Sequence, residues 1–193
     1  SGPAALTKVN AIVELILASS SESRRQLLQQ AGIPATVVAP QVNEEDIHAA
    51  EPAQRALLRA ELKANAVARL HPACLVLGAD QVVFDGHEIF GKPTSPADHI
   101  ARLRSMRGKS HQLITGYCLI GPDLRKTGTQ VTTLTVREDL QDDEIAAYVR
   151  SGEGSQCAGG YAAEGHGAWL FSAIDGDWFN VLGLPILTII DLL

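Results

Sequence analysis

The chain has 193 residues, of which 46% are hydrophobic and 20% charged, and its formal net charge is −6 at pH 7. These values are ordinary for one globular domain with a sizeable core. The negative charge argues against a broad surface for a nucleic-acid polymer, although a small anionic ligand needs only a few local cations. No apolar run reaches the length that crosses a membrane, so we expect no membrane partner.

Cysteine usage and the first residues bear on the compartment. Cys74, Cys118 and Cys157 are widely spaced and lack the spacing of a metal site. A cytoplasmic, reducing environment is the simplest interpretation. Residues 1–13 lack the pattern of a signal peptide, and we expect them to be a poorly ordered lead-in to a single domain that spans residues 1–193.

The first half of the chain alternates strands and helices. In chain order we expect a strand, a helix, a strand, a helix and a strand at 14–18, 22–31, 35–39, 52–70 and 75–83. Ser21 is a candidate N-cap of the first helix, Gly32 its stop, and Pro52 opens the second helix. Asp85-Gly86 predicts a hairpin turn between 81–84 and 87–90.

Paired strands dominate the second half of the chain. We expect a helix at 95–104, strands at 109–120 and 126–136, a helix at 142–150, a glycine-rich loop at 152–167, a strand at 168–174 and a closing apolar helix at 185–193. The whole order predicts an α/β fold with a mixed, twisted sheet flanked by helices.

The strand at 75–83 carries the most informative feature of the chain. Asp80 and Gln81 interrupt its apolar run near the far end. A carboxylate in a core strand costs free energy unless it is paired, hydrogen-bonded or bound to a cation. Because α/β folds place their chemistry where strands end, Asp80 is a candidate catalytic group. The alternative is a strand-end cap or turn former.

The stretch from Ser19 to Arg25 is a candidate phosphate site. A strand ends in three serines and runs into a helix that begins with Arg24 and Arg25. Free N–H groups at a helix N-terminus bind anions, and Ser19, Ser21 and a forked arginine add donors. Basic residues in a first helical turn oppose the helix dipole unless an anion is bound. The alternative is an ordinary serine N-cap with solvated arginines.

Three further charged residues are candidates. Glu44, in an acidic run after a strand, could be a ligand of a divalent cation or part of a solvated loop. Lys63 flanks the apolar stripe of its helix and could point into a cleft or extend to solvent. Lys92 lies between Gly91 and Pro93, on a stiff turn that fixes its direction; a solvated turn lysine is the alternative.

The glycine-rich stretch at 158–167 is a candidate base-reading loop. Glycines allow the backbone to approach a ligand closely. Glu164 could accept two hydrogen bonds from a base with two donors, as guanine has at N1–H and N2–H. The alternative is a flexible surface loop. The six histidines are scattered without ligand spacing, which gives no support to a histidine-based metal site.

Together these features suit phosphoryl chemistry on a nucleotide, in which cations offset phosphate charge and a carboxylate activates water. On them the chain resembles the Maf family of nucleotide pyrophosphatases, which is related in fold to the inosine triphosphate pyrophosphatases. The motifs that carry the resemblance, from Leu15 to the end, are LASSSESRR (17–25), VNE (42–44), ELKA (61–64), GADQ (78–81), GKP (91–93), TG (115–116), AGGYAAEGHG (158–167) and VLGLP (181–185).

The resemblance implies a cleft between two lobes, a homodimer, and hydrolysis of a nucleoside triphosphate to a monophosphate and pyrophosphate with Mg²⁺ or Mn²⁺. The family's general base falls on Asp80, and Ser21 lies in the phosphate loop. The family's phosphate and metal contacts fall on Ser19, Arg24, Glu44, Lys63 and Lys92. We expect Asp80, Lys63 and Lys92 to act in catalysis, with Glu44 and Asp80 holding the metal.

Three positions set the choice of base in this family, and here they are Ser23, Gln81 and Glu164. Gln81 and Glu164 match the group that acts on 7-methyl-GTP, which is our main expectation. Ser23 departs from that group, because an aromatic residue there would stack on the base. The alternatives are a dTTP/UTP pyrophosphatase, an enzyme of broad specificity, and, in another class, a non-catalytic nucleotide-binding regulator of septum formation.

Overall fold

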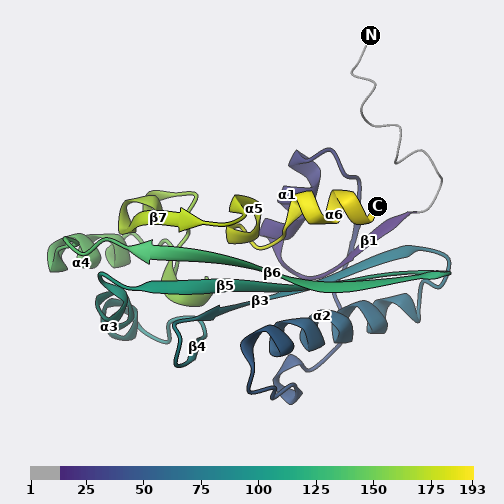
Figure 1. Cartoon of the computed structure of the whole chain (residues 1–193), viewed down its shortest axis with the longest axis horizontal. Coiled ribbons are helices and arrows are strands. Elements are labelled where there is room, and N and C mark those ends of the chain that lie inside the picture. Colours follow the sequence, from purple (N-terminus) through teal and green to yellow (C-terminus); the bar gives the residue numbers. More distant parts are fainter. Residues whose placement is uncertain (1–13) are drawn as a thin grey trace, which may run out of the picture.

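A seven-stranded mixed sheet organises the chain, as the computed structural model shows (Figure 1). The structure describes residues 14–193, so the expected lead-in at 1–13 lies outside the described residues. The strand order is β2-β1-β3-β5-β6-β7, and β4 also pairs with β3. The strands are β1 (Leu15–Ala18), β2 (Thr36–Val38), β3 (Leu75–Phe84), β4 (Ile89–Phe90), β5 (Ser110–Gly121), β6 (Leu124–Val136) and β7 (Phe171–Asp175). The α/β class with a mixed sheet is confirmed.

Helices cover both faces of this sheet. The helices are α1 (Glu22–Gln30), α2 (Pro52–Ala68), α3 (Pro96–Met106), α4 (Asp142–Arg150), α5 (Trp178–Val181) and α6 (Ile186–Leu192). In Figure 1, α2 lies on one face, α1, α5 and α6 lie on the other, and α3 and α4 gather at the far end of the long β5–β6 hairpin. No helix within residues 14–193 is long and apolar enough to span a membrane.

Alternation along β3 assigns its side chains to these two faces. Leu77 and Ala79 join the buried cluster that includes residues of α1 and α6. Val76 joins the cluster that includes the alanines of α2. Since successive side chains of a strand point to opposite faces, Asp80 faces α2 and Gln81 faces the layer of α1, α5 and α6.

Helix α2 lies unusually close to the sheet. A Cβ atom placed on Gly78 would come within 2.3 Å of the main-chain oxygen of Ala60, and one on Gly116 within 2.4 Å of the main chain of Ala56. The facing residues of α2 are themselves fully buried alanines. Glycine in β3 and β5 and alanine in α2 therefore let the helix backbone approach, which brings the side chain of Lys63 within reach of the strand.

One edge of β3 has a gap in its pairing. The last β1–β3 pair is Ala18 with Gly78, and β4 pairs with β3 only from Val83 onward. β5 pairs with the opposite edge of β3 across this interval. Within the described chain, no strand pairs with the free edge between these two points, and Asp80 and Gln81 lie there. The loops that follow β1 and β4 flank this gap.

The structure bears out most of the expected elements and corrects two. Ser21 accepts a hydrogen bond as the N-cap of α1, and Gly32 follows the helix with a φ of 72°. Asp80 does not lie at the exit of its strand, because β3 continues to Phe84; the strand that ends beside it is β1. The expected strand at 168–174 begins only at Phe171, since residues 166–170 form a 3-10 helix.

Candidate active site

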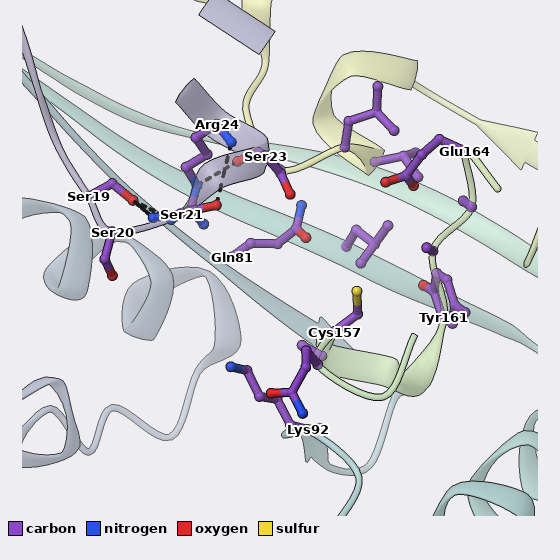
Figure 2. Close-up of a pocket in the computed structure, with 18 of the residues that line it drawn as sticks. Ser19, Ser20, Ser21, Ser23, Arg24, Gln81, Lys92, Cys157, Tyr161 and Glu164 are labelled. Carbon is purple, nitrogen blue, oxygen red and sulfur yellow. Dashed lines mark hydrogen bonds between the residues drawn. The ribbon is translucent and has the colours of Figure 1, made fainter. Parts of the chain in front are cut away.

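A cleft of about 500 Å³ lies beside the gap in the sheet (Figure 2). It is lined by the loop after β1, by the loop after β4 and by the glycine-rich stretch at 156–164. The candidate residues from the sequence that line it are Ser19, Ser21, Ser23, Arg24, Glu44, Lys63, Gln81, Lys92 and Glu164. Asp80 lies directly behind this wall, in contact with Lys63. Segments distant in sequence thus meet at one cavity.

Lys63 is held between two carboxylates. Its Nζ lies 2.8 Å from Oδ1 of Asp80 and 2.8 Å from Oε2 of Glu44, and it donates to the main-chain oxygen of Ala79 at 3.4 Å. Lys63 is only 5% exposed and Asp80 only 7%. Lys63 therefore points into the cleft rather than out to solvent, and a buried charge held in this way is compensated on two sides.

The second oxygen of Asp80 is buried without a hydrogen-bond partner among the described residues. A buried acceptor of this kind carries a desolvation cost that a proton donor or a cation would relieve. The Glu44 carboxylate reaches the same ammonium, so two hard oxygen donors converge here. This donor set suits Mg²⁺, which proteins hold with one or two carboxylates plus substrate phosphates. No larger cluster of metal-binding side chains occurs in the part of the chain described.

Arg24 is fixed in place by the loop that precedes its helix and by a distant glycine. Its Nε donates to the main-chain oxygen of Gly183 at 2.9 Å, and its Nη1 donates to Oγ of Ser19 at 3.4 Å. Ser19 is buried and also accepts from the main-chain N–H of Ser21 at 3.1 Å. Figure 2 shows Ser19, Ser20, Ser21 and Arg24 grouped at one end of the cleft.

The two arginines of α1 have different roles. Burial lowers the pKa of the Arg24 guanidinium below its usual value, and the carboxylates of Asp80 and Glu44 oppose this shift. The guanidinium of Arg24 therefore interacts electrostatically with these two carboxylates of the cleft. Arg25, by contrast, pairs with Glu22 on the surface of the helix. The expectation of a basic group aimed at an anion thus applies to Arg24 alone.

The cleft is charged at one end and mostly apolar at the other. Arg24, Lys63 and Lys92 are the basic residues of its lining, and Lys92 reaches it from the loop after β4 (Figure 2). The apolar lining is Leu113, Ala158, Tyr161, Ala162, Ala163, Val181 and Leu182. This division matches a ligand with an anionic end and a flat, mostly apolar end.

Gln81 and Glu164 are two polar side chains near the apolar end, and Gln156 also lines the cleft. Nε2 of Gln81 donates to the main-chain oxygen of Asn180 at 2.6 Å and to Oγ1 of Thr115 at 3.0 Å. Glu164 is exposed and lies across the cleft from Gln81 (Figure 2). Ser23 is also exposed and lies in the cleft lining, between Glu164 and the serine loop.

The glycine-rich loop is anchored rather than free. Nε2 of His99 contacts the main-chain oxygen of Gly160 at 2.5 Å, and Nε2 of His111 contacts the hydroxyl of Tyr161 at 2.5 Å. Burial lowers the pKa of His111 to about 4, so that this imidazole is neutral at pH 7. Two buried histidines therefore anchor the segment just before Glu164, one through a main-chain oxygen and one through a side-chain hydroxyl, which argues against a freely flexible loop.

Sequence reasoning missed three residues of this site. Thr115 and Gly183 stood in motifs but had no assigned role, and Asn180 stood in no motif. Asn180 and Gly183 act through main-chain oxygens, which no side-chain pattern reveals. Thr115 could have been found from the expected pairing of its strand with that of Gln81, because the two residues are directly opposite in register.

The chain is similar in sequence to known proteins over most of its length. A family model described as Maf-like protein matches residues 14–193. A dTTP/UTP pyrophosphatase of Deinococcus radiodurans is 41% identical, over 93% of this chain and 91% of that protein. A nucleoside triphosphate pyrophosphatase of Synechococcus sp. (strain CC9311) is 43% identical, over 89% and 94%. A dTTP/UTP pyrophosphatase of Pyrococcus furiosus is 38% identical, over 93% and 94%.

Among solved structures, the Ham1 protein of Staphylococcus aureus is similar over 65% of this chain and 72% of that chain, with 16% identity and a TM-score of 0.47.

Proposed function

The chain belongs to the Maf-like protein family, and from this premise we propose that it is a nucleoside triphosphate pyrophosphatase. One observation carries the proposal: Lys63 is held 2.8 Å from both Asp80 and Glu44 at the charged end of a cleft of about 500 Å³. That volume suits a nucleotide-sized ligand. The names of the relatives supply the reaction class.

The two ends of the cleft suggest how the substrate binds. The triphosphate would lie along the serine loop, where main-chain N–H groups at the start of α1 and the guanidinium of Arg24 face it. Lys92 would meet the phosphates from the opposite wall. The base would enter the apolar end, between Gln81 and the glycine-rich loop.

Asp80 is the proposed general base. Its buried, unpartnered oxygen would accept a proton from the attacking water, and water would cleave the anhydride between the α- and β-phosphates. The products are a nucleoside monophosphate and pyrophosphate. Lys63 orients the carboxylate of Asp80, and together with Arg24 it would offset the negative charge that develops on the phosphate oxygens.

We also propose that the reaction requires Mg²⁺ or Mn²⁺, held by Glu44 and Asp80 with substrate phosphates as further ligands. The convergence of two carboxylates supports this assignment. Metal binding by Asp80 would lower its basicity, so its roles as metal ligand and as general base would compete. The bound ion would neutralise phosphate charge and align the substrate. The ammonium of Lys63 would then be shared between the carboxylates and the phosphates.

The base preference expected from the sequence needs revision. The relatives described above carry the names dTTP/UTP pyrophosphatase and nucleoside triphosphate pyrophosphatase, and none of these names mentions 7-methyl-GTP. The dTTP/UTP alternative therefore fits these findings better than the 7-methyl-GTP expectation. We propose dTTP and UTP as the first substrates. The absence of an aromatic side chain at Ser23 agrees with a base that does not rely on stacking there.

The test is product analysis on a panel of nucleotides. Purified protein with Mg²⁺ or Mn²⁺ should convert dTTP or UTP to the monophosphate and pyrophosphate, and a chelator should abolish turnover. Release of inorganic phosphate and a diphosphate instead would contradict the proposed cleavage position. No turnover with any nucleotide, together with measurable nucleotide binding, would favour the non-catalytic regulator.

A further inference from the structure

Two hydrogen bonds within the protein fix the orientation of the Gln81 side-chain amide. We propose that Thr115 and Asn180 are positioning residues that hold its carbonyl oxygen toward the cleft, so that the site selects nucleobases with a protonated ring nitrogen. Uracil, thymine, guanine and hypoxanthine form this class, whereas cytosine and adenine fall outside it. The inference rests on the proposed function and adds a rule for its substrates.

The orientation of the Gln81 amide follows from its two partners. The main-chain oxygen of Asn180, 2.6 Å from Nε2, only accepts hydrogen bonds. The NH₂ group must therefore face Asn180, and the hydroxyl of Thr115 at 3.0 Å takes its second hydrogen. A flipped amide would set two acceptors against each other. Both donors of Gln81 are used within the protein, and Oε1 remains as the group available to a ligand.

Asn180 is itself held rigidly. It is fully buried, and its Nδ2 donates to the main-chain oxygens of Leu113 at 3.1 Å and Gln130 at 3.3 Å and to the hydroxyl of Thr132 at 3.0 Å. These contacts attach it to both β5 and β6. Its main-chain oxygen therefore has a fixed position, which makes it a reliable reference for the Gln81 amide.

Thr115 accepts the second of these hydrogen bonds, from the neighbouring strand. It is fully buried and directly opposite Gln81 in the β3–β5 register. Residues paired in this way lie on the same face of a sheet, with side chains close enough to bond. The hydroxyl therefore holds the amide at the point where β3 has no strand partner on its other edge.

The polarity of Gln81 decides which bases can bind. Uracil and thymine present N3–H, and guanine and hypoxanthine present N1–H, each of which can donate to a carbonyl oxygen. Cytosine N3 and adenine N1 carry a lone pair instead, which would leave two acceptors facing each other without a proton between them. Glu164 is an acceptor as well when ionised, so Gln81 and Glu164 both present acceptors to a base.

Matched nucleotide pairs test this rule. UTP and CTP share sugar, phosphates and ring size, and so do ITP and ATP, but only the first member of each pair has the ring N–H. We expect kcat/KM to be at least about tenfold higher for UTP than for CTP, and for ITP than for ATP, with most of the difference in KM. Equal values within both pairs would overturn the proposal.

Variants then test whether these hydrogen bonds to Gln81 set the base preference. Thr115→Val keeps the shape of the side chain but removes the acceptor, and it should lower the UTP/CTP ratio at least about threefold. Thr115→Ser retains the hydroxyl and should preserve the ratio. Gln81→Met removes the base-facing oxygen and should bring the ratio close to one, which provides a second test if Thr115→Val does not fold. A purely structural role would lower the activity on all nucleotides equally, and an unchanged ratio in Thr115→Val and Gln81→Met would contradict the proposal.

Binding measurements separate this inference from the proposed activity. Titration calorimetry of UTP and CTP with Mg²⁺ gives their Kd values whether or not turnover occurs, if the Asp80→Asn variant is used. Tighter binding of UTP, by about tenfold, with no hydrolysis by the wild type would overturn the pyrophosphatase and retain the rule. Hydrolysis of both nucleotides with equal Kd values would retain the pyrophosphatase and overturn the rule.

Discussion

Asp80 and Gln81 are adjacent in β3 but are held from opposite faces of the sheet. Lys63 of α2 contacts Asp80 on one face, while the main-chain oxygen of Asn180, in α5, contacts Gln81 on the other. This is possible because β1 ends at Ala18, opposite Gly78, which exposes the next part of the β3 edge to one cleft. The proposed general base and the proposed base-facing group are thus neighbours in one strand.

The close approach of α2 predicts the effect of adding one carbon atom to the sheet. Gly116→Ala would place a Cβ about 2.4 Å from the main chain of Ala56, and neither backbone can yield cheaply. We expect a loss of about 2–3 kcal/mol in the free energy of unfolding, measured by urea denaturation. We also expect reduced turnover, because Lys63 would move with the helix.

Gly91→Ala is the matched control for stability. Nothing lies within 4 Å of a Cβ at that position, and Gly91 does not have a positive φ. Its free energy of unfolding should stay within about 0.5 kcal/mol of the wild type. If Gly116→Ala proved equally harmless, the close-packing account of α2 would be wrong.

Replacing Lys63 tests how much the free energy of unfolding depends on its ion pair with Asp80. Lys63→Met leaves the buried Asp80 carboxylate without its cation, and we expect about 3 kcal/mol of destabilisation. The double variant with Asp80→Asn should recover a large part of that loss, because the buried charge is removed and the remaining Glu44 carboxylate is partly exposed to solvent. Additive effects in this double-mutant cycle would show that the two side chains do not interact.

Arg24 and Arg25 provide a matched pair for the phosphate site. Arg24→Lys loses the Nε contact to Gly183 and the forked donor geometry, so KM for the triphosphate should rise about tenfold. Arg25→Lys alters surface contacts with Glu22 and Gln29 and should leave KM unchanged. Steady-state kinetics on both variants decides the point. Equal effects would remove Arg24 from the phosphate site.

His111 predicts part of the dependence of stability on pH. Its pKa is about 4 in the folded protein against 6.5 for the free side chain. The unfolded chain therefore binds a proton below pH 6.5 that the folded protein takes up only near pH 4, so acidification through this window favours unfolding. The effect of this one residue is about 3 kcal/mol.

Denaturation curves between pH 7 and 4 test the role of His111. The His111→Phe variant should lack this part of the pH dependence, whereas His48→Gln, at an exposed position, should behave like the wild type. The same steepness in wild type and His111→Phe would mean that His111 titrates normally in the folded protein.

Local signals in the sequence were sufficient for most elements. Ser21 and Gly32 mark the two ends of α1, because helix capping depends on residues close in the sequence. The turn at Asp85-Gly86 also depends on nearby residues, since Asp85 accepts hydrogen bonds from His87 and Glu88. The strand expected at 168–174 starts later than predicted. Glu153 accepts hydrogen bonds from the main-chain N–H groups of His166 and Gly167 and stabilises a 3-10 helix there. That contact spans 14 residues and leaves no periodic trace.

The site was predictable as a set of side chains but not as a geometry. The sequence identified Lys63 and Glu44, yet only the approach of α2 to Gly78 and Gly116 explains why Lys63 reaches Asp80. The α5 helix, only four residues long, was too short for a helical pattern, so the contact of Asn180 with Gln81 was missed. Main-chain contacts of this kind leave no side-chain pattern in the sequence.

The most direct test of the whole account is pyrophosphate release by Asp80→Asn. This substitution keeps the shape of the side chain but removes the proposed base, and turnover of UTP or dTTP should fall at least about a hundredfold. Asp85→Asn is the control, because that residue caps the β3–β4 turn and its amide oxygen can still accept from His87 and Glu88. Turnover by Asp80→Asn equal to that of Asp85→Asn would contradict the central claim that Asp80 activates the attacking water.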